Sequence, residues 1–421
     1  MQGLSGSLKL RLGFAFAITV GVALGAEPRE GPRAVQNPSV GDGGVSAFYV
    51  WDKGVPGTPG RLLRQEPVPS ELMLASASQG LRLLYTSTDG LDGKTPITGS
   101  GDVYFPRGEA PPGGWPVIAW AHGTTGIADV CAPSWTGRTQ RDADYLSAWL
   151  AQGYVVVATD YQGLGTPGGH PYLAVKPEAF SMLDSVRAAR REFPELSNAV
   201  VLVGQSQGAH AVLSASLLAK DYAPDLNVKG VVATGVPGMP PFLPETTAPQ
   251  IPTPRLEGGI FPSIFLLLLV ANETMTPPFD SSAAVTERAR SALAAVKTGC
   301  EFIQAARDAG LTVDNELRIR PEEVLARAAA VIRYPTVRFD HPVFVGTGLA
   351  DTVTSPEGQY NFVTAACRAG SRVEMHYYAG LDHGGTVNPS LMDSVPFVKS
   401  AFAGQPFAGN CTSVAAPIGV R

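Results

Sequence analysis

Short apolar runs without polar alternation recur along this chain and predict its architecture. The clearest run occupies residues 199–203 and contains only alanine, valine and leucine. A strand that is apolar at every position is typically buried on both faces, as in a parallel sheet. Further strands are predicted at 81–87, 98–105, 116–121, 155–160, 228–233, 342–346 and 372–378.

Helical spacing follows several of these strands, near 142–152, 178–193, 357–368 and 390–402. Behind the 199–203 run, Ala209, Val212, Leu213 and Leu217 fall on one face of a helix. Buried strands that alternate with amphipathic helices predict an α/β fold, a mostly parallel central sheet flanked by helices.

The alternation stops between residues 238 and 336, where we expect an inserted, mainly helical cap domain. Helical patterns lie near 283–306 and 321–332. The apolar run 260–270 is too short to span a membrane, and it is either an internal packing helix or the lining of an acyl-binding pocket. We therefore divide the remaining chain into an N-terminal arm (26–78), a first core segment (79–237), and a second core segment with the C-terminal tail (337–421).

A serine motif joins the 199–203 strand directly to its helix, as Gly204-Gln205-Ser206-Gln207-Gly208. Strand, Gly-x-Ser-x-Gly and helix is the context of a nucleophile in the α/β-hydrolase fold. The turn is crowded, so a Cβ at either glycine would collide with it. We expect Ser206 to be the nucleophile, and the amide of Gln207, at the helix N-terminus, to donate to an oxyanion.

A second oxyanion donor is expected in the loop after strand 116–121, which contains His122, Gly123, Thr124, Thr125 and Gly126. In this fold a backbone amide of that loop approaches the substrate between small neighbours. We assign it to Thr124, with Thr125 as an alternative.

The base and the orienting acid are expected after the last strands. The chain has six histidines, and His383 follows strand 372–378 in a glycine-flanked loop, whereas His376 lies inside that strand. Asp351 follows strand 342–346, where the carboxylate that orients the imidazole is expected. The order Ser206, Asp351, His383 is that of α/β hydrolases.

No cofactor or metal is expected. The glycine-rich run from Gly163 to Gly168 follows a predicted strand, as the fingerprint of a dinucleotide-binding site does. Pro167 and Pro171, however, prevent the helix whose N-terminus would bind the pyrophosphate. The chain has no His-Glu-x-x-His motif, and its cysteine spacings do not match a zinc site. The chain has 16% charged residues, a net charge of -5 and no run of basic residues, so nucleic acid is not an expected partner.

The N-terminus indicates export. Lys9 and Arg11 precede an apolar stretch that ends in small residues, which predicts a signal peptide over 1–25 and a secreted or periplasmic protein; an uncleaved anchor is the alternative. Four cysteines in an exported chain favour two disulfides, in any of three pairings: Cys131, Cys300, Cys367 and Cys411.

Several motifs together resemble the secretory lipase family related to fungal lipase A. They are the run 121–126 leading to Cys131-Ala132-Pro133-Ser134, Asp160-Tyr161-x-Gly163-x-Gly165, the serine motif, and Gly380-x-x-His383. The resemblance implies a triacylglycerol lipase or carboxylesterase with a helical cap that acts on small-molecule or lipid esters, with a lipid–water interface as a candidate partner. It also implies the pairings Cys131 with Cys300 and Cys367 with Cys411.

Three other functions are compatible with these residues. One is a short-chain or polyester-active carboxylesterase without true lipase activity. Another is an exopeptidase, which shares the fold and the triad but should have an acidic pocket for an amine. The third is a binding protein on an inactive hydrolase scaffold, which the presence of nucleophile, acid and base disfavours.

Overall fold

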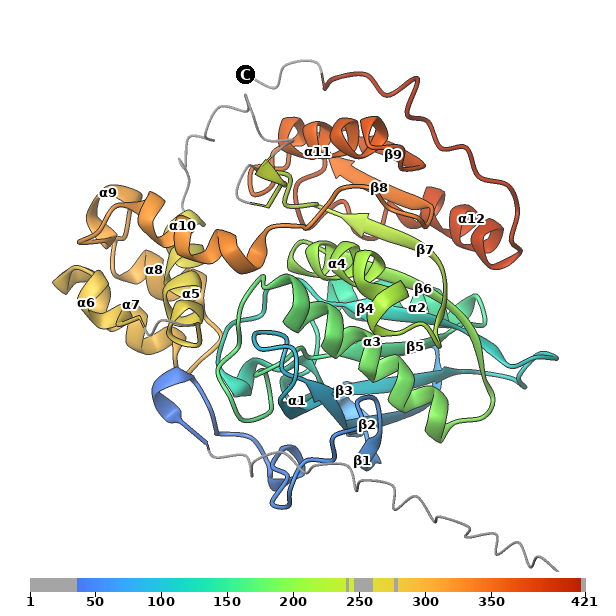
Figure 1. Ribbon diagram of the computed structural model, residues 1–421, viewed down its shortest axis with the longest axis horizontal. Helices are drawn as coiled ribbons and strands as arrows, with labels where there is room; N and C mark the ends of the chain where they lie inside the picture. Colours follow the sequence, from blue (N-terminus) through green and yellow to red (C-terminus); the bar gives the residue numbers. More distant parts are fainter. Residues whose placement is uncertain (1–35, 240–241, 246–259, 276–278, 418–421) are drawn as a thin grey trace, which may run out of the picture.

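The computed structural model describes residues 36–239, 242–245, 260–275 and 279–417. The described strands form one nine-stranded sheet in the order β1-β2-β3-β5-β4-β6-β7-β8-β9 (Figure 1). Pairings are antiparallel from β1 to β5 and parallel from β5 to β9. The strands are β1 (Leu62–Pro67), β2 (Ala77–Thr88), β3 (Pro96–Pro106), β4 (Trp115–Ala121), β5 (Val155–Thr159), β6 (Leu196–Gln205), β7 (Asn227–Thr234), β8 (Val343–Gly348) and β9 (Val373–Tyr378). The mostly parallel sheet expected from the sequence is confirmed.

Helices cover both faces of the sheet, which explains why the central strands lack polar alternation. Val200 and Leu202 of β6 pack with α3 (Val175–Glu192), α4 (Gln207–Tyr222) and α11 (Pro356–Arg368) on one face. Val201 and Val203 pack on the other face with α2 (Gln140–Ala151) and α12 (Leu391–Phe402). Successive side chains of one strand therefore fill two different cores.

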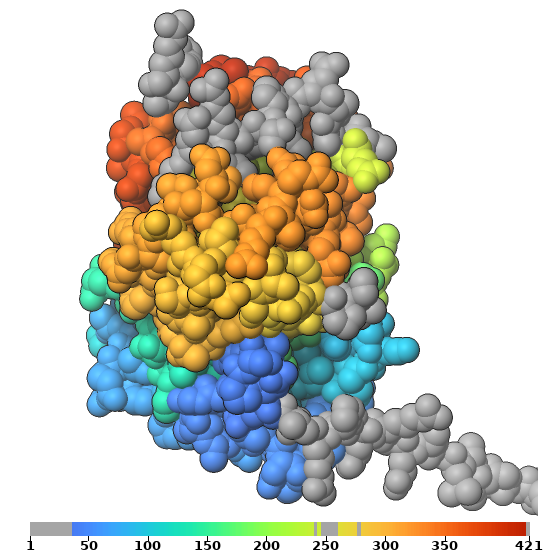
Figure 2. Space-filling model, turned by 90° about the vertical axis from the view of Figure 1, so that its left-hand side faces the viewer, coloured from blue at the N-terminus to red at the C-terminus, as the bar shows by residue number. Residues whose placement is uncertain are grey.

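The helical block between β7 and β8 contains α5 (Phe261–Glu273), α6 (Ser281–Ala284), α7 (Arg290–Val296), α8 (Phe302–Asp308), α9 (Val313–Glu316) and α10 (Pro321–Ile332). It lies at one end of the sheet, yellow to orange in Figure 1, and Figure 2 shows it between N-terminal residues in blue and C-terminal residues in red. Residues 265–272 of α5 are all buried, and α5 packs against α7, α8 and α10. The apolar run is thus an interior helix of the block.

Two features of the chain differ in detail from the sequence expectation. The segment 26–78, expected as an extended arm, contributes the edge strand β1, which pairs with β2. The helical pattern at 283–306 is divided among three short helices instead of one. The predicted signal peptide lies outside the described residues.

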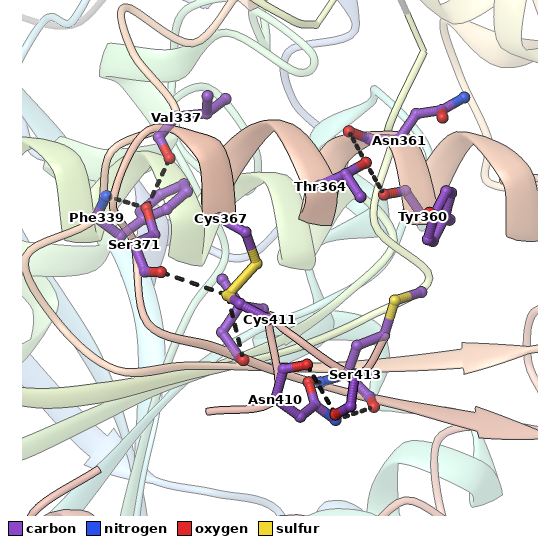
Figure 3. Close-up of a disulfide and its surroundings, with 12 residues drawn as sticks. Val337, Phe339, Tyr360, Asn361, Thr364, Cys367, Ser371, Asn410, Cys411 and Ser413 are labelled. Atoms are coloured by element: carbon purple, nitrogen blue, oxygen red, sulfur yellow. Dashed lines mark hydrogen bonds between the residues drawn. A yellow bond between two sulfur atoms is a disulfide. The ribbon is translucent and has the colours of Figure 1, made fainter. Parts of the chain in front are cut away.

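Two disulfides join segments that are distant in sequence. Cys131, in a short turn after β4, bonds Cys300, just before α8, and so links the sheet domain to the helical block. Cys367 at the end of α11 bonds Cys411 of the C-terminal tail (Figure 3). Beside it, the Asn410 side chain accepts from the Met375 amide and donates to the Met375 carbonyl, both at 2.9 Å. The tail is therefore fixed along the edge strand β9.

None of the helices within the described ranges is long and apolar enough to cross a membrane.

Candidate active site

A sharp turn carries Ser206 between β6 and α4. Its φ of 58° and ψ of -117° lie in a region that non-glycine residues rarely occupy. A Cβ on Gly204 would lie 2.2 Å from the carbonyl oxygen of Gly208, and a Cβ on Gly208 would lie 1.9 Å from that of Ala121. Because these neighbours are backbone atoms, only glycine fits at positions 204 and 208, as the sequence predicts. The Ser206 amide donates to the carbonyl of Thr234 (2.9 Å), so the strained turn is tied to the neighbouring strand β7.

Asp351 and His383 meet at the carboxyl ends of β8 and β9. Nδ1 of His383 lies 2.8 Å from Oδ2 of Asp351. The Thr354 hydroxyl (2.8 Å) and the Gln359 amide (3.2 Å) donate to the same oxygen, and the amides of Val353 and Thr354 donate to Oδ1. These donors stabilise an ionised carboxylate. Asp351 is a hydrogen-bond acceptor there, so Nδ1 carries a proton, and in the neutral imidazole Nε2 is then the nitrogen with the lone pair.

The imidazole of His383 lies over the backbone next to the serine turn. A Cβ on Gly235 would lie 2.7 Å from Cε1 of His383, and Gly235 directly follows Thr234, the partner of the Ser206 amide. Nε2 of His383 is buried and makes no hydrogen bond to any described residue, the Ser206 hydroxyl included. The structure thus brings the three predicted side chains to one edge of the sheet. Nε2 of His383 has no hydrogen-bond partner among the described residues.

The two predicted oxyanion residues follow the ends of two adjacent strands, β4 and β6. Gln207 is the first residue of α4, where backbone amides have no partner within the helix. Thr124 follows β4, which pairs with β6 through Ala121 and Gly204. A Cβ on Gly123 would lie 2.3 Å from Oε1 of Gln205, so the loop after β4 closely approaches the serine turn.

Thr125, the alternative donor, has a buried hydroxyl without a hydrogen-bond partner among the described residues. The Thr124 hydroxyl instead lies 2.7 Å from the hydroxyl of Tyr172.

The other histidines near this edge are engaged elsewhere. Burial lowers the pKa of His122 to about 4, and its Nδ1 lies 2.7 Å from the carbonyl of Gly123. His210 contacts the buried carboxylate of Glu178 (2.7 Å) and the carbonyl of Ile332 (2.8 Å). His376 pairs with Glu374. None of them contacts Asp351, as His383 does.

Sequence reasoning missed the groups that support the site. Thr354 and Gln359 donate to Asp351, while His170, Tyr172 and Glu178 contact the two predicted oxyanion residues. They belong to no motif, and their contacts exist only in the folded chain. Within the part of the chain that the structure describes, no three His, Cys, Asp or Glu residues are grouped to hold a metal ion.

Comparison with known proteins agrees with this geometry. The family model described as secretory lipase matches residues 129–408. Lipase A of Moesziomyces aphidis is 24% identical over 375 residues, which cover 82% of this chain and 77% of that protein. The crystal structure of Candida antarctica lipase A in its closed state covers 92% of this chain and 91% of its own, at 23% identity and a TM-score of 0.68.

A third relative is named as a probable inactive lipase, MT1628, of Mycobacterium tuberculosis. It is 30% identical over 188 residues, 41% of each chain. The match to the family model spans most of the chain, including Ser206, Asp351 and His383. The chain therefore belongs to the secretory lipase family, carboxylic ester hydrolases built on the α/β-hydrolase fold.

Proposed function

We propose that this protein is a secreted serine hydrolase that cleaves acylglycerols or related carboxylic esters through an acyl-enzyme on Ser206. The observation that carries the proposal is the Asp351–His383 pair, joined at 2.8 Å beside the strained serine turn, with Nε2 free. The family model supports export, and the N-terminal apolar stretch would be its signal peptide.

Acyl transfer proceeds in two steps in this proposal. Ser206 Oγ attacks the ester carbonyl while Nε2 of His383 takes its proton, and Asp351 stabilises the imidazolium through Nδ1–H. The tetrahedral intermediate collapses as Nε2 returns the proton to the leaving alcohol. Water, deprotonated by the same nitrogen, then attacks the acyl-enzyme, and the second tetrahedral intermediate collapses as Nε2 returns that proton to Ser206 Oγ and the acid is released. The amides of Thr124 and Gln207 donate to the oxyanion of both tetrahedral intermediates.

The helical block between β7 and β8 is proposed as the cap over this site. Its last helix α10 reaches the catalytic helix, because the Ile332 carbonyl lies 2.8 Å from Nε2 of His210 on α4. The Cys131–Cys300 disulfide fixes the block to the loop after β4, which also carries Thr124. The proposed cap is thus attached to both elements that carry the proposed oxyanion donors, the loop after β4 and helix α4.

The experiment is hydrolysis of p-nitrophenyl esters from acetate to palmitate, with tributyrin and triolein emulsions beside them. Activity should disappear in Ser206→Ala and persist in Ser216→Ala, a control on the helix that follows Ser206, where the Ser216 hydroxyl lies 2.9 Å from Nδ1 of His341. A fluorophosphonate should label Ser206 alone by mass spectrometry. Full activity of Ser206→Ala, or an inactive wild type, contradicts the proposal.

The alternative is a short-chain or polyester-active carboxylesterase. The burial of α5 favours it, because the apolar side chains from Phe265 to Ala271 pack within the hydrophobic core of the protein. Activity that ends at the octanoate ester would identify this enzyme, whereas activity on triolein would identify a lipase.

A further inference from the structure

One buried turn contacts both proposed oxyanion residues. In the loop that connects β5 to α3, the hydroxyl of Tyr172 lies 2.7 Å from that of Thr124, and Nε2 of His170 lies 3.0 Å from Nε2 of Gln207. His170 is 1% exposed and Tyr172 is 2% exposed. The amide of Tyr172 donates to the carbonyl of His170 (2.9 Å), so the two side chains project from a single closed turn.

The contact from His170 has a defined donor and acceptor. Its Nδ1 lies 2.8 Å from the carbonyl oxygen of Gln162, which only accepts, so Nδ1 carries the proton. Nε2 therefore accepts from the side-chain amide of Gln207. Burial lowers the pKa of His170 to about 4, which keeps the ring neutral, with Nε2 an acceptor, near neutral pH.

Glu178 of α3 completes the arrangement. Its Oε1 accepts from the Gln207 side chain (3.0 Å), so both amide hydrogens of Gln207 have an acceptor. The same oxygen accepts from the backbone amide of Leu173 (3.1 Å), a residue with a positive φ of 60°. One carboxylate thus holds the Gln207 side chain and the strained end of the turn together.

We propose that the turn from His170 to Tyr172 positions the oxyanion hole, with Tyr172 fixing Thr124 and His170, aided by Glu178, fixing Gln207. This inference rests on the proposed function. Neither side chain touches the substrate: each acts through the residue whose backbone amide donates to the oxyanion. An oxyanion hole accelerates a reaction because its donors are already aligned before charge develops, and one element that holds both donors sets the spacing between them.

The test is a double-mutant cycle on the intact enzyme. Tyr172→Phe and Thr124→Val each remove one hydroxyl of the 2.7 Å pair while the Thr124 backbone amide remains. Each should lower kcat on p-nitrophenyl butyrate about tenfold with KM nearly unchanged, and the double variant should be no slower than either single variant. Affinity for a trifluoromethyl ketone, which forms an oxyanion on the serine, should fall in parallel with kcat.

Tyr49→Phe is the matched control, since it removes a similarly buried hydroxyl pair, Tyr49 with Ser134 at 2.9 Å. It should leave kcat near the wild-type value. His170→Gln, which keeps an acceptor near the position of Nε2, should retain more kcat than His170→Leu at equal folded content by circular dichroism. This pair also tests the inference if Tyr172→Phe does not fold.

The outcomes separate this inference from the function on which it rests. If Ser206→Ala is inactive but Tyr172→Phe keeps the wild-type kcat, or if its effect adds fully to that of Thr124→Val, positioning by the turn is wrong and the esterase mechanism stands. If the wild type hydrolyses no ester, the proposed function and this inference are overturned together.

Discussion

Gly208 offers a sharp test of the serine turn because two effects of opposite sign act on it. It is the second residue of α4, and alanine in a helix is favoured over glycine by about 1 kcal/mol. An added Cβ, however, would lie 1.9 Å from the carbonyl oxygen of Ala121 and 2.9 Å from that of His122. Both are backbone atoms, so no side-chain rotation relieves the overlap.

The overlap should dominate in Gly208→Ala. Moving from 1.9 Å to an ordinary contact of 3.4 Å requires the start of α4 and the end of β4 to separate by about 1.5 Å. Overpacking of this kind costs about 3 kcal/mol, and helix propensity offsets up to 1 of it, which leaves a net loss of about 2 kcal/mol in the free energy of unfolding. The same movement displaces Gln207 relative to Thr124, so kcat/KM should fall about 100-fold.

Urea unfolding and p-nitrophenyl butyrate kinetics measure the two effects. Gly230→Ala is the control: Gly230 is also buried, in β7, but its added Cβ would lie 3.4 Å from the ring of Phe397, an ordinary contact. We expect this variant to lose no more than about 1 kcal/mol and to keep its activity. Gly208→Ala with the stability and kcat/KM of the wild type would refute the steric reasoning.

Two further substitutions test the acid of the site and a buried carboxyl of the helical block. Asp351→Asn removes the carboxylate that lies 2.8 Å from Nδ1 of His383, so kcat should fall about 10³-fold or more with KM little changed, and a loss below tenfold would contradict the assigned role. Glu316 of α9 is fully buried, neither carboxyl oxygen has a partner among the described residues, and burial raises its pKa to about 9 from 4.5. The folded state binds this proton more tightly than the unfolded state, so the free energy of unfolding falls as pH rises from 4.5 towards 9. Glu316→Gln should therefore gain on the wild type by about 4 kcal/mol between pH 5 and pH 8 in urea unfolding. An equal stability difference at the two pH values would show that the carboxyl does not titrate in this way.

Local pattern determined the part of the protein built from neighbouring residues. The all-apolar run 199–203 predicts a strand covered on both faces, and the structure places Val200 and Val201 in two different cores. The spacing of Gly204 and Gly208 predicts a turn too crowded for side chains, and the contact of Gly204 with Gly208 lies within that turn, whereas Gly208 is confined by Ala121 of β4. Chain order alone indicated Asp351 and His383, since in a parallel sheet the carboxyl ends of β8 and β9 meet at one edge.

Only the tertiary structure decided the contacts between distant segments. The edge strand β1 has no strong period of its own and exists through its pairing with β2. His170 and Tyr172 lie in a loop without a motif, and 37 and 48 residues separate them from the residues they hold, Gln207 and Thr124. The periodicity of apolar residues indicates which face of a helix or strand is buried. It does not indicate which side chains of another element that face contacts. The residues proposed as nucleophile, base and acid could therefore be named from the sequence, whereas the side chains proposed to align the oxyanion donors became visible only once the chain was folded.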